Sequence, residues 1–493
     1  MLCQKIGPRH KILEVMLFLP FFLTSSVFAQ DKNQQVASSE FPLQVNSVEE
    51  EYEYIANQRC TCGGTYEVIS QWTLEKDGKH IDELKARCTK CEKERIFSFD
   101  VSSLFEQYDL MLSKEAREKT FAALSKKYPQ PTAGQIPEFV KILDSADPNA
   151  KLWAIQTIAA IGTEEAINIL LDRYLTADVM PMFDYRDCLA NKGELILSAV
   201  DERLREQLTQ EQRWRLIDLL GETGSPKARA IIEGQIRDVS PQLRRIAYIS
   251  LGRLACKESE NVLLECLEQE KPSPDDALIW ALGRCATKTS FSALWYYAEH
   301  GEKAVRLTAI AALGVAGDET AIPFLITILK NEKSLVTQSH AIYALGQLKT
   351  KEAVPLLIEC LKKGPVIMES MERVYIYDNH VVDGNDTFGF AVEALGRIGD
   401  SRALPAFREI LRNEDTWLSY ASDVARACAQ MWAKEMVPDL IERLEKDQGQ
   451  IKEFAGVADQ AQSYGPHLKA LTGQDFGDDA EKWRAWLETQ TSK

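Results

Sequence analysis

A Leu-Gly pair that returns at a nearly constant interval is the feature that most restricts the fold of this 493-residue chain. The pairs end at Gly221, Gly252, Gly283, Gly314, Gly346 and Gly396. The first three intervals are 31 residues, the fourth is 32, and the fifth is 50, which corresponds to one repeat and an insert. Upstream, Gly162 fits the same register and Gly193 marks an irregular repeat. A repeat of roughly 20–50 residues is one supersecondary unit that cannot bury its apolar face alone, so neighbouring units must stack.

The residues around each pair predict two helices per repeat. Over residues 305–313, apolar residues recur at three- and four-residue steps, which is typical of one helical face. A second apolar stripe follows, near Pro323, Pro355 or Pro405, because proline is tolerated in the first turn of a helix. Asp318 can cap this second helix. Glycine suits the left-handed residue that ends a helix, so we expect each Leu-Gly pair to close the first helix.

The repeat resembles HEAT repeats of the short bacterial type, which also occur in phycobilisome lyases. The residues that carry the resemblance are Arg306, Ala309, Ala312, Leu313 and Gly314, with a second copy at Arg244, Ala247, Leu251 and Gly252. The resemblance covers residues 135–446 and implies an all-α fold, an α-solenoid of HEAT-like helical hairpins with a curved surface that binds other proteins. It does not imply lyase activity, because many unrelated functions share this repeat.

Four cysteines precede the repeats as two close pairs, Cys60 with Cys62 and Cys88 with Cys91. The 25 intervening residues give zinc-ribbon spacing, because each tight turn supplies two of the four thiolates of a tetrahedral Zn²⁺ site. We predict structural Zn²⁺ at these four residues. Two alternatives stay open, since exported thiols can oxidise to disulfides and a Cys-x-x-Cys pair can be redox-active.

The segment around these cysteines resembles a zinc ribbon over residues 52–101. Residues 65–70 and 95–100 alternate like strands, and Gly63 and Gly64 allow the backbone to fold under a metal. The segment departs from the ribbon pattern in its Cys-x-Cys first pair and in Glu92, which stands where a glycine often follows the second pair. We therefore expect a small β-rich, zinc-ribbon-like domain before the solenoid.

The N-terminus predicts an exported protein, either periplasmic or extracellular. Residues 1–29 have a basic start, an apolar stretch and small residues at Val27 and Ala29, which is the pattern of a cleaved signal peptide. A retained membrane anchor is the alternative, although the apolar run is short for a spanning helix. After cleavage we expect no membrane span. Residues 30–51 are polar and indicate a linker.

Two further segments flank the array. Residues 102–134 predict connecting helices that end before Pro129. Residues 447–493 predict a C-terminal helical cap, in which Asp478 or Asp479 caps a last helix that carries Trp483 and Trp486. Terminal repeats of solenoids need such a cap.

The array has one insert, at residues 363–386, where a short turn is otherwise expected. Loops inserted in a solenoid often lie on the binding face, so we treat its polar and aromatic residues as candidate partner contacts. These residues are Tyr375, Tyr377, Asp378, His380 and Asp383. A solvated loop is the alternative, and the spacing of the acidic residues departs from that of an EF-hand calcium loop.

The charge and the motif content restrict the function. The chain has 74 acidic and 58 basic residues, a net charge of −16, which argues against nucleic acid as a partner and mildly favours basic proteins. The sequence has no G-x-S-x-G elbow, phosphate loop or H-E-x-x-H motif. We therefore predict a non-enzymatic protein–protein interaction scaffold. The alternatives are a lyase-like enzyme on the same scaffold and a thiol redox protein that uses Cys88 and Cys91.

Overall fold

The computed structural model describes residues 43–45, 48–76, 79–103, 114–177, 179–238, 240–364, 373–376, 380–383, 387–413, 416–454 and 463–491. The predicted signal peptide lies outside these residues. The chain divides into two compact units, with the boundary between Ile161 and Gly162. Among the described residues, no helix combines the length and the apolar character that crossing a membrane requires.

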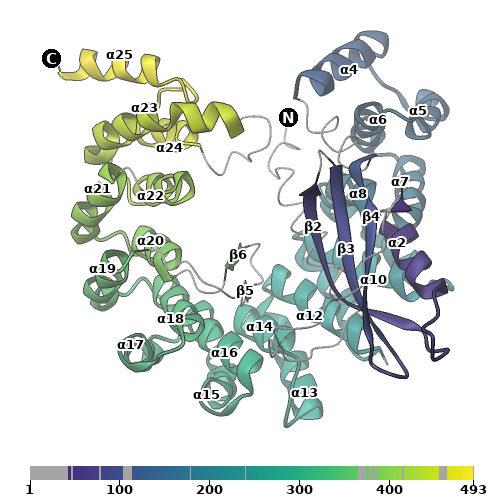
Figure 1. The fold of residues 1–493 in the computed structure, drawn as a ribbon, viewed down its shortest axis with the longest axis horizontal. Coiled ribbons are helices and arrows are strands. Elements are labelled where there is room, and N and C mark those ends of the chain that lie inside the picture. Colours follow the sequence, from purple (N-terminus) through teal and green to yellow (C-terminus); the bar gives the residue numbers. More distant parts are fainter. Residues whose placement is uncertain are drawn as a thin grey trace. The chain divides into compact units, whose positions relative to one another are not determined.

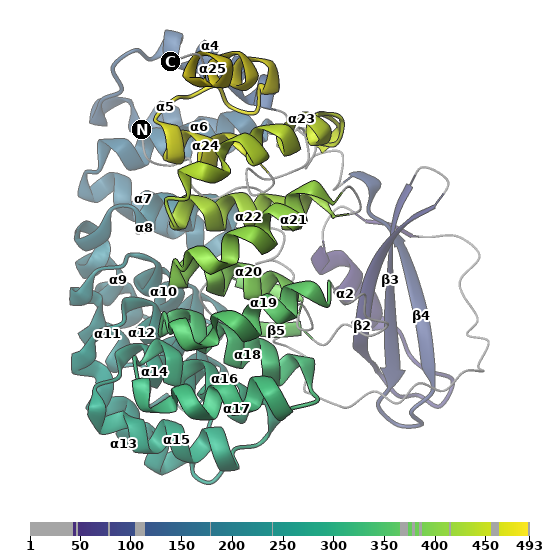
Figure 2. The same cartoon turned by 90° about the vertical axis from the view of Figure 1, so that its left-hand side faces the viewer.

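The N-terminal unit contains a four-stranded sheet with the order β1-β4-β3-β2, shown from one side in Figure 2. The strands are β1 (Leu43–Gln44), β2 (Tyr66–Lys76), β3 (Lys79–Cys88) and β4 (Glu94–Asp100). β1 runs parallel to β4, and the other two pairs are antiparallel. The two predicted strand segments correspond to β2 and β4, whereas β1 and the start of helix α2 (Val48–Asn57) lie within residues 30–51, which the polar composition indicates as linker.

Aromatic and aliphatic side chains form the core between α2 and the sheet. Ile55 of α2 packs with Leu84, Phe97 and Phe99, all of which are buried. The ring of Tyr54 meets the Phe99 ring edge-on, with centroids 5.7 Å apart. This core is small, which makes the loops that carry the cysteines important for the stability of the sheet.

Three helices complete the N-terminal unit: α4 (Lys114–Lys127), α5 (Ile136–Leu143) and α6 (Pro148–Ile161). α4 ends before Pro129, as the sequence predicts, because proline cannot continue the helix. Tyr128, Phe139 and Trp153 pack against one another at ring-centroid separations of 5.1–5.7 Å. This aromatic cluster joins the end of α4 to α5 and α6.

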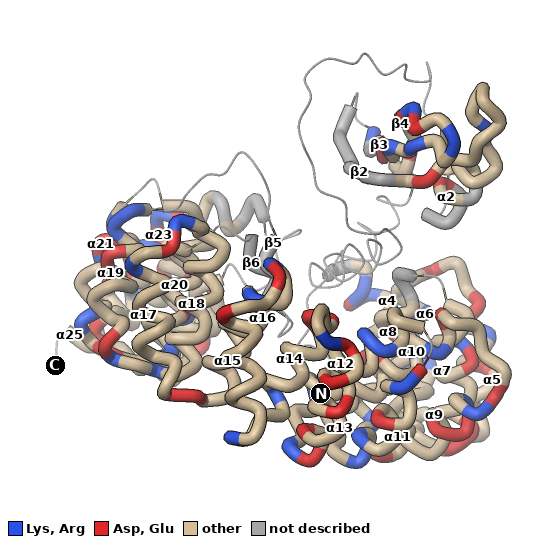
Figure 3. The backbone as a smooth tube through the Cα atoms, turned by 90° about the horizontal axis from the view of Figure 1, so that it is seen from below, with Lys and Arg blue, Asp and Glu red and all other residues tan. Residues whose placement is uncertain are grey.

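The C-terminal unit is a solenoid of helical hairpins (Figure 1), which confirms the predicted fold class. It begins with α7 (Glu164–Thr176), α8 (Val179–Ala190) and α9 (Leu197–Leu204). Its inner helices are α10 (Gln210–Glu222), α12 (Pro241–Leu254), α14 (Asp276–Cys285), α16 (Lys303–Val315), α18 (Leu335–Gln347), α20 (Thr387–Ile398) and α22 (Leu418–Gln430). Its outer helices in Figure 1 are α13 (Glu260–Glu270), α15 (Phe291–His300), α17 (Ile322–Asn331), α19 (Val354–Lys362) and α21 (Leu404–Arg412). Helix α11 (Arg229–Glu233) has the corresponding place in the chain between α10 and α12. Figure 3 shows acidic and basic positions interspersed along this stack.

The glycine of each Leu-Gly pair lies inside an inner helix, so the prediction that it ends the helix is wrong. Gly314 sits one residue before the end of α16, and a Cβ there would lie 2.4 Å from Cα of Ala344 in the next inner helix. The other five glycines likewise contact the next inner helix. The residues of that helix that they meet are, in chain order, Ser250, Trp280, Ala312, Ala394 and Ala427. The repeated glycine therefore allows adjacent inner helices to pack closely, and the stack curves toward them.

The left-handed residue occurs three positions later in the repeat. Gly224, Gly317 and Gly399 have positive φ angles, and the same positions in other repeats hold Ala255, Lys349 and Trp432. Gly162 and Gly193 also have positive φ and lie 62 and 31 residues before Gly224. They belong to this second register, so the prediction that Gly162 fits the Leu-Gly register is wrong. Two glycine series with the same period run through the sequence, which makes them easy to confuse.

In two repeats, the arginine of the signature joins an inner helix to the stretch of chain just before it. The side chain of Arg244 donates to the carbonyl of Asp238 at 2.9 Å. Arg213 donates to the carbonyl of Leu204 at 3.1 Å, at the equivalent position of the preceding repeat. Asp318 accepts from the backbone N–H of Thr320 at 3.1 Å and caps the next turn, as predicted. These bonds satisfy backbone groups that a helix end leaves without an intrahelical partner.

The insert contains an antiparallel pair of short strands, β5 (Arg373–Ile376) and β6 (His380–Asp383). Tyr377 and Asp378 lie outside the described residues. For Tyr375, His380 and Asp383 the structure describes the backbone alone, with Tyr375 opposite Val381. The role of these five residues as partner contacts stays a prediction.

The C-terminal helices are α23 (Val437–Phe454), α24 (Gly465–Thr472) and α25 (Ala480–Thr491). Asp479 accepts from the backbone N–H of Lys482 at 3.1 Å and caps α25, while Asp478 accepts from the N–H groups of Tyr464 and Gly465 at the start of α24. Trp483 is fully buried, and its indole N–H donates to the carbonyl of Gly477 at 2.7 Å. The two aspartates therefore cap two successive helices.

Candidate functional site

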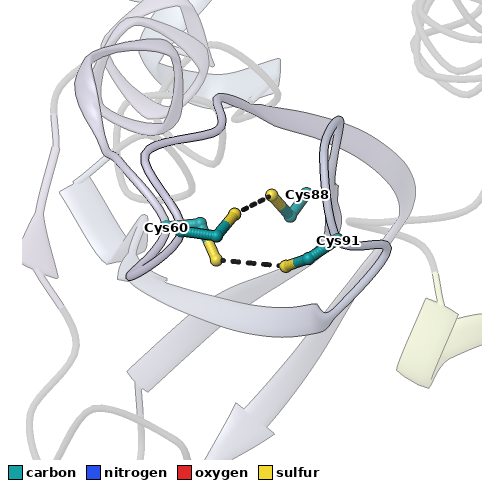
Figure 4. Close-up of side chains that lie close together, drawn as sticks. Cys60, Cys88 and Cys91 are labelled. Atoms are coloured by element: carbon teal, nitrogen blue, oxygen red, sulfur yellow. Dashed lines mark hydrogen bonds between the residues drawn. The ribbon is translucent and has the colours of Figure 1, made fainter.

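The four N-terminal cysteines lie together between two turns of the sheet (Figure 4). The sulfur atoms of Cys60, Cys62, Cys88 and Cys91 all lie within 4.8 Å of one another. Sγ of Cys60 is 3.6 Å from that of Cys91, and Sγ of Cys62 is 3.4 Å from that of Cys88. The structure thus brings together the four residues that the sequence predicts as metal ligands.

Tight backbone turns place each pair. In the first turn, the N–H of Gly63 donates to the carbonyl of Cys60 at 2.7 Å, and Gly63 has a φ of +76°. In the second, the N–H of Glu92 donates to the carbonyl of Cys88 at 3.0 Å, and Glu92 has a φ of +58°. Glu92 therefore occupies the left-handed position for which a zinc ribbon often uses glycine, at an energetic cost that glycine avoids.

The two turns are also joined to each other. The N–H of Thr89 donates to the carbonyl of Thr65 at 2.9 Å, and the hydroxyls of these two threonines are 3.0 Å apart. The N–H of Lys90 points to Sγ of Cys88 at 3.4 Å. Gly64 allows this approach, because a Cβ at that position would lie 2.5 Å from Sγ of Cys88.

The sulfur geometry fits a tetrahedral zinc ion. Zn–S bonds of about 2.3 Å in a tetrahedron put the sulfurs about 3.8 Å apart. The sulfur separations of 3.4 and 3.6 Å are close to this value. They are far from the roughly 2.05 Å of a disulfide, and all four cysteines are free thiols in the structure. Thiolates favour Zn²⁺ among the common divalent ions of proteins.

The backbone around the sulfurs favours thiolates at two of the four positions. The backbone N–H of Cys62 is the main cause that lowers the pKa of Cys60 to about 6. Backbone N–H groups of Cys91 and Lys90 lower the pKa of Cys88. Cys91 has a backbone hydrogen bond with Lys93 that lowers its pKa, but desolvation and the contacts with the other three sulfurs outweigh this and raise the value to about 12. A bound cation would favour the thiolate form of all four sulfurs.

The sulfur environment differs from that of a dithiol oxidoreductase. Cys88 is the last residue of β3, and Cys91 lies in the turn that follows. In such enzymes the N-terminus of a helix lowers the thiol pKa. No helix begins at Cys88 or Cys91. Cys62 and Cys91 are exposed, whereas Cys60 and Cys88 are buried.

Among its described residues, the solenoid exposes three large aromatic side chains. The exposed fractions of Tyr296, Trp417 and Trp432 are 54%, 55% and 68%. Tyr296 lies in an aromatic run of the sequence, but its neighbour Tyr297 is buried. Trp417 stacks on Tyr420, with ring centroids 5.9 Å apart. The sequence alone does not distinguish these from core aromatics, although Trp432 could be found by aligning the positions three residues after each repeat glycine.

Comparison with known proteins identifies repeats in the C-terminal unit. Residues 291–368 match the model of HEAT repeats, and residues 389–413 match that of the PBS lyase HEAT-like repeat. A search of curated proteins gives no match. The fold is similar to that of the CpcE–CpcF complex of phycocyanin lyase from Nostoc sp. PCC7120, at 15% identity and a TM-score of 0.31, over 60% of this chain and 94% of that one. It is also similar to human deoxyhypusine hydroxylase, at 15% identity and a TM-score of 0.24, over 64% and 99%. HEAT-like repeats are thus identified in α15–α19 and α20–α21.

Proposed function

We propose that this chain is an exported, non-enzymatic scaffold that binds proteins through its HEAT-like solenoid in the periplasm or outside the cell. The observation that carries the proposal is the repetition of one close helix contact. Six successive glycines each accept the next inner helix at the same place in the repeat. Such repetition extends a regular surface across many residues, which is how solenoids bind partners.

The cysteine cluster has a structural role in this proposal. Cys60, Cys62, Cys88 and Cys91 hold one Zn²⁺, which joins the two turns that carry them. Four protein ligands fill a tetrahedral site and leave no open position for a substrate, in contrast to catalytic zinc sites. Metal analysis of the purified mature protein should give one zinc per chain, and a value near zero would refute this assignment.

The exposed aromatic residues of the array are the expected contacts with the partner. Trp and Tyr dominate binding energy at protein interfaces. Trp432 carries the further observation that it has a φ of +55° at a position where three other repeats have glycine and two have Ala255 and Lys349. Backbone strain at an exposed residue favours a functional reason for keeping it. The net charge of −16 favours a basic partner.

A substitution at Trp432 tests this role. We expect Trp432→Gly to raise the free energy of unfolding by about 1 kcal/mol, because glycine adopts the left-handed conformation without strain. We also expect the same variant to weaken partner capture at least tenfold. The measurements are chemical denaturation and affinity purification of the mature protein from native extracts, followed by titration with the purified partner.

Lys349→Gly is the matched control. Lys349 has a φ of +51° at the equivalent position of another repeat and is exposed, so its replacement relieves the same strain without removing an aromatic ring. It should stabilise the protein and leave partner affinity unchanged. If Trp432→Gly binds the partner as tightly as the natural protein, Trp432 is not a contact.

A lyase-like enzyme is the second candidate, favoured by the match of residues 389–413 to the PBS lyase HEAT-like repeat. Such an enzyme needs converging polar groups, and the insert at residues 363–386, which contains Asp378, His380 and Asp383, is the candidate segment for them. Deletion of residues 365–386 tests the insert as the active site of such an enzyme. Turnover should be lost with the insert, and turnover that survives the deletion would exclude a site there.

A further inference from the structure

We infer that the cysteine cluster can join its two turns in two ways, by a metal ion or by a pair of disulfides with the connectivity Cys60–Cys91 and Cys62–Cys88. The inference rests on the proposed zinc site and adds a second chemical state to it. In that state the metal is released, and two covalent bonds connect the same two turns.

The positions of the sulfur atoms favour this connectivity. Both hydrogen-bonded sulfur contacts, at 3.6 and 3.4 Å, cross from one turn to the other. Closing each to a bond of about 2.05 Å requires a shift of about 1.5 Å. Disulfides within a turn, Cys60–Cys62 and Cys88–Cys91, would leave the two turns without a covalent connection.

The backbone keeps the two turns adjacent while the sulfurs react. The N–H of Thr89 donates to the carbonyl of Thr65 at 2.9 Å, and their hydroxyls are 3.0 Å apart. These bonds do not involve any sulfur. These bonds hold the turns in register while the sulfurs react, and each disulfide that forms replaces the cross-link that the metal supplied.

The four thiols differ in exposure, and this assigns them different roles. The exposed thiols react with the oxidant, and the buried thiols then form the disulfides with them. Each proposed disulfide joins one exposed cysteine to one buried cysteine: Cys91 to Cys60, and Cys62 to Cys88. An oxidant that arrives from solvent meets Cys62 or Cys91 first. The buried partner then lies within 3.6 Å, in position to attack the oxidised sulfur.

With a peroxide as the oxidant, the atoms and electrons balance. The exposed thiolate takes one oxygen from hydrogen peroxide and becomes a sulfenic acid, and hydroxide leaves. The buried thiolate attacks that sulfur, the S–O bond breaks, and the disulfide forms with release of a second hydroxide. Protons convert both hydroxides to water, so two thiols and one peroxide give one disulfide and two waters. Loss of the thiolates releases Zn²⁺.

Peroxide treatment of the zinc-loaded, full-length mature protein tests the inference. We expect two equivalents of hydrogen peroxide to release one zinc per chain, measured with a chromogenic chelator. Mass spectrometry of the unreduced digest should recover the Cys60–Cys91 and Cys62–Cys88 peptides. The other six described cysteines are buried and should stay reduced, which provides an internal control. Dithiothreitol and added zinc should restore the starting state.

Other products would overturn the inference. Disulfides within a turn, or sulfinic and sulfonic acids at Cys62 and Cys91, would show that the buried cysteines do not resolve the oxidised sulfurs. Cys62→Ser provides a second readout, because it should form the Cys60–Cys91 disulfide and leave Cys88 unpaired. A protein that contains no zinc at the outset would instead refute the proposed metal site, so the two failures are distinguishable.

Discussion

Glu92 shows how a single backbone angle bears on the stability of the metal turns. Its φ of +58° places a residue with a Cβ in the left-handed region. Glu92→Gly removes that strain, and we expect it to raise the melting temperature of the sheet and its free energy of unfolding by about 1 kcal/mol. Thermal unfolding of the zinc-loaded protein measures this effect.

Lys93→Gly is the control for Glu92→Gly. Lys93 is exposed, lies in the same turn and is not among the residues with positive φ. Glycine at position 93 relieves no strain and increases the conformational entropy of the unfolded chain. The variant should therefore be less stable than the natural protein. An equal effect of both glycines would mean that the angle at Glu92 carries no strain.

At the metal turns, the spacing of the cysteines predicts which residues meet, but the residue types do not predict the backbone angles. Two cysteine pairs separated by 25 residues predict that the sulfurs meet, and they do, within 4.8 Å. The residue type at position 92 predicts the opposite of the observed angle, because glutamate disfavours positive φ. The hydrogen bonds of the turn determine that angle, and the sequence does not reveal them.

At the scale of the helices, the same distinction explains the misplaced glycines. The period of 31 residues predicts the repeats and their inner and outer helices. It does not tell whether a glycine is kept for its φ angle or for its missing side chain. The two glycine series lie three residues apart in the sequence. They differ in that the glycines of the Leu-Gly pairs contact the next repeat, whereas the others have positive φ angles. That contact is between repeats, so the pattern within one repeat cannot predict it.

Gly314→Ala tests the packing role of the repeat glycine. Helix propensity alone would make alanine more stable by about 1 kcal/mol in the middle of a helix. The added Cβ would lie 2.4 Å from Cα and 2.6 Å from the carbonyl oxygen of Ala344, and both are backbone atoms that cannot rotate away. The inner helices must separate, so we expect a net loss of about 1–3 kcal/mol, measured by denaturant unfolding.

Gly317→Ala separates this packing effect from backbone strain. Gly317 has a φ of +77°, and a Cβ there would have no neighbour within 4 Å. We expect it to cost about 1 kcal/mol through the left-handed angle alone. Stability of Gly314→Ala equal to that of the natural protein would show that the inner helices can separate without cost.

His340 should make the array sensitive to acid. It is buried in α18, and its Nδ1 lies 2.8 Å from the carbonyl oxygen of Val336. Burial lowers its pKa from 6.5 to about 4. Between these values the unfolded chain binds a proton that the folded chain does not, so stability is complete above pH 6.5 and falls as the pH drops toward 4.

His340→Asn should reduce this acid dependence. One such histidine contributes a slope of about 1.4 kcal/mol per pH unit in that window, and the variant should lose this part of the slope. Burial also lowers the pKa of His467 to about 4, so some dependence should remain. Denaturant unfolding at several pH values measures the slopes, and identical slopes in the two proteins would exclude His340 as the cause.

At the scale of the whole molecule, the sheet and the solenoid depend on different sources of stability. The described part of the solenoid buries a long apolar core that each repeat extends. The sheet has a core of eight buried residues, and a domain with so little apolar burial needs a cross-link or a metal. The solenoid therefore depends on packing, whereas the sheet depends on its thiols.

Removal of the metal should consequently unfold the sheet and spare the solenoid. We expect a strong chelator, with a reductant present, to abolish the calorimetric transition of the sheet and to leave the larger transition of the solenoid within about 2 °C, because metal binding supplies folding free energy only where the ligands are. Far-ultraviolet circular dichroism should keep most of its helical signal. Cys88→Ala should reproduce the chelated state without chelator, whereas Cys266→Ala, in a buried position of α13, should destabilise only the solenoid. A loss of helical signal upon chelation would mean that the sheet and the solenoid unfold together, and that the zinc site supports the binding surface as well as the domain that holds it.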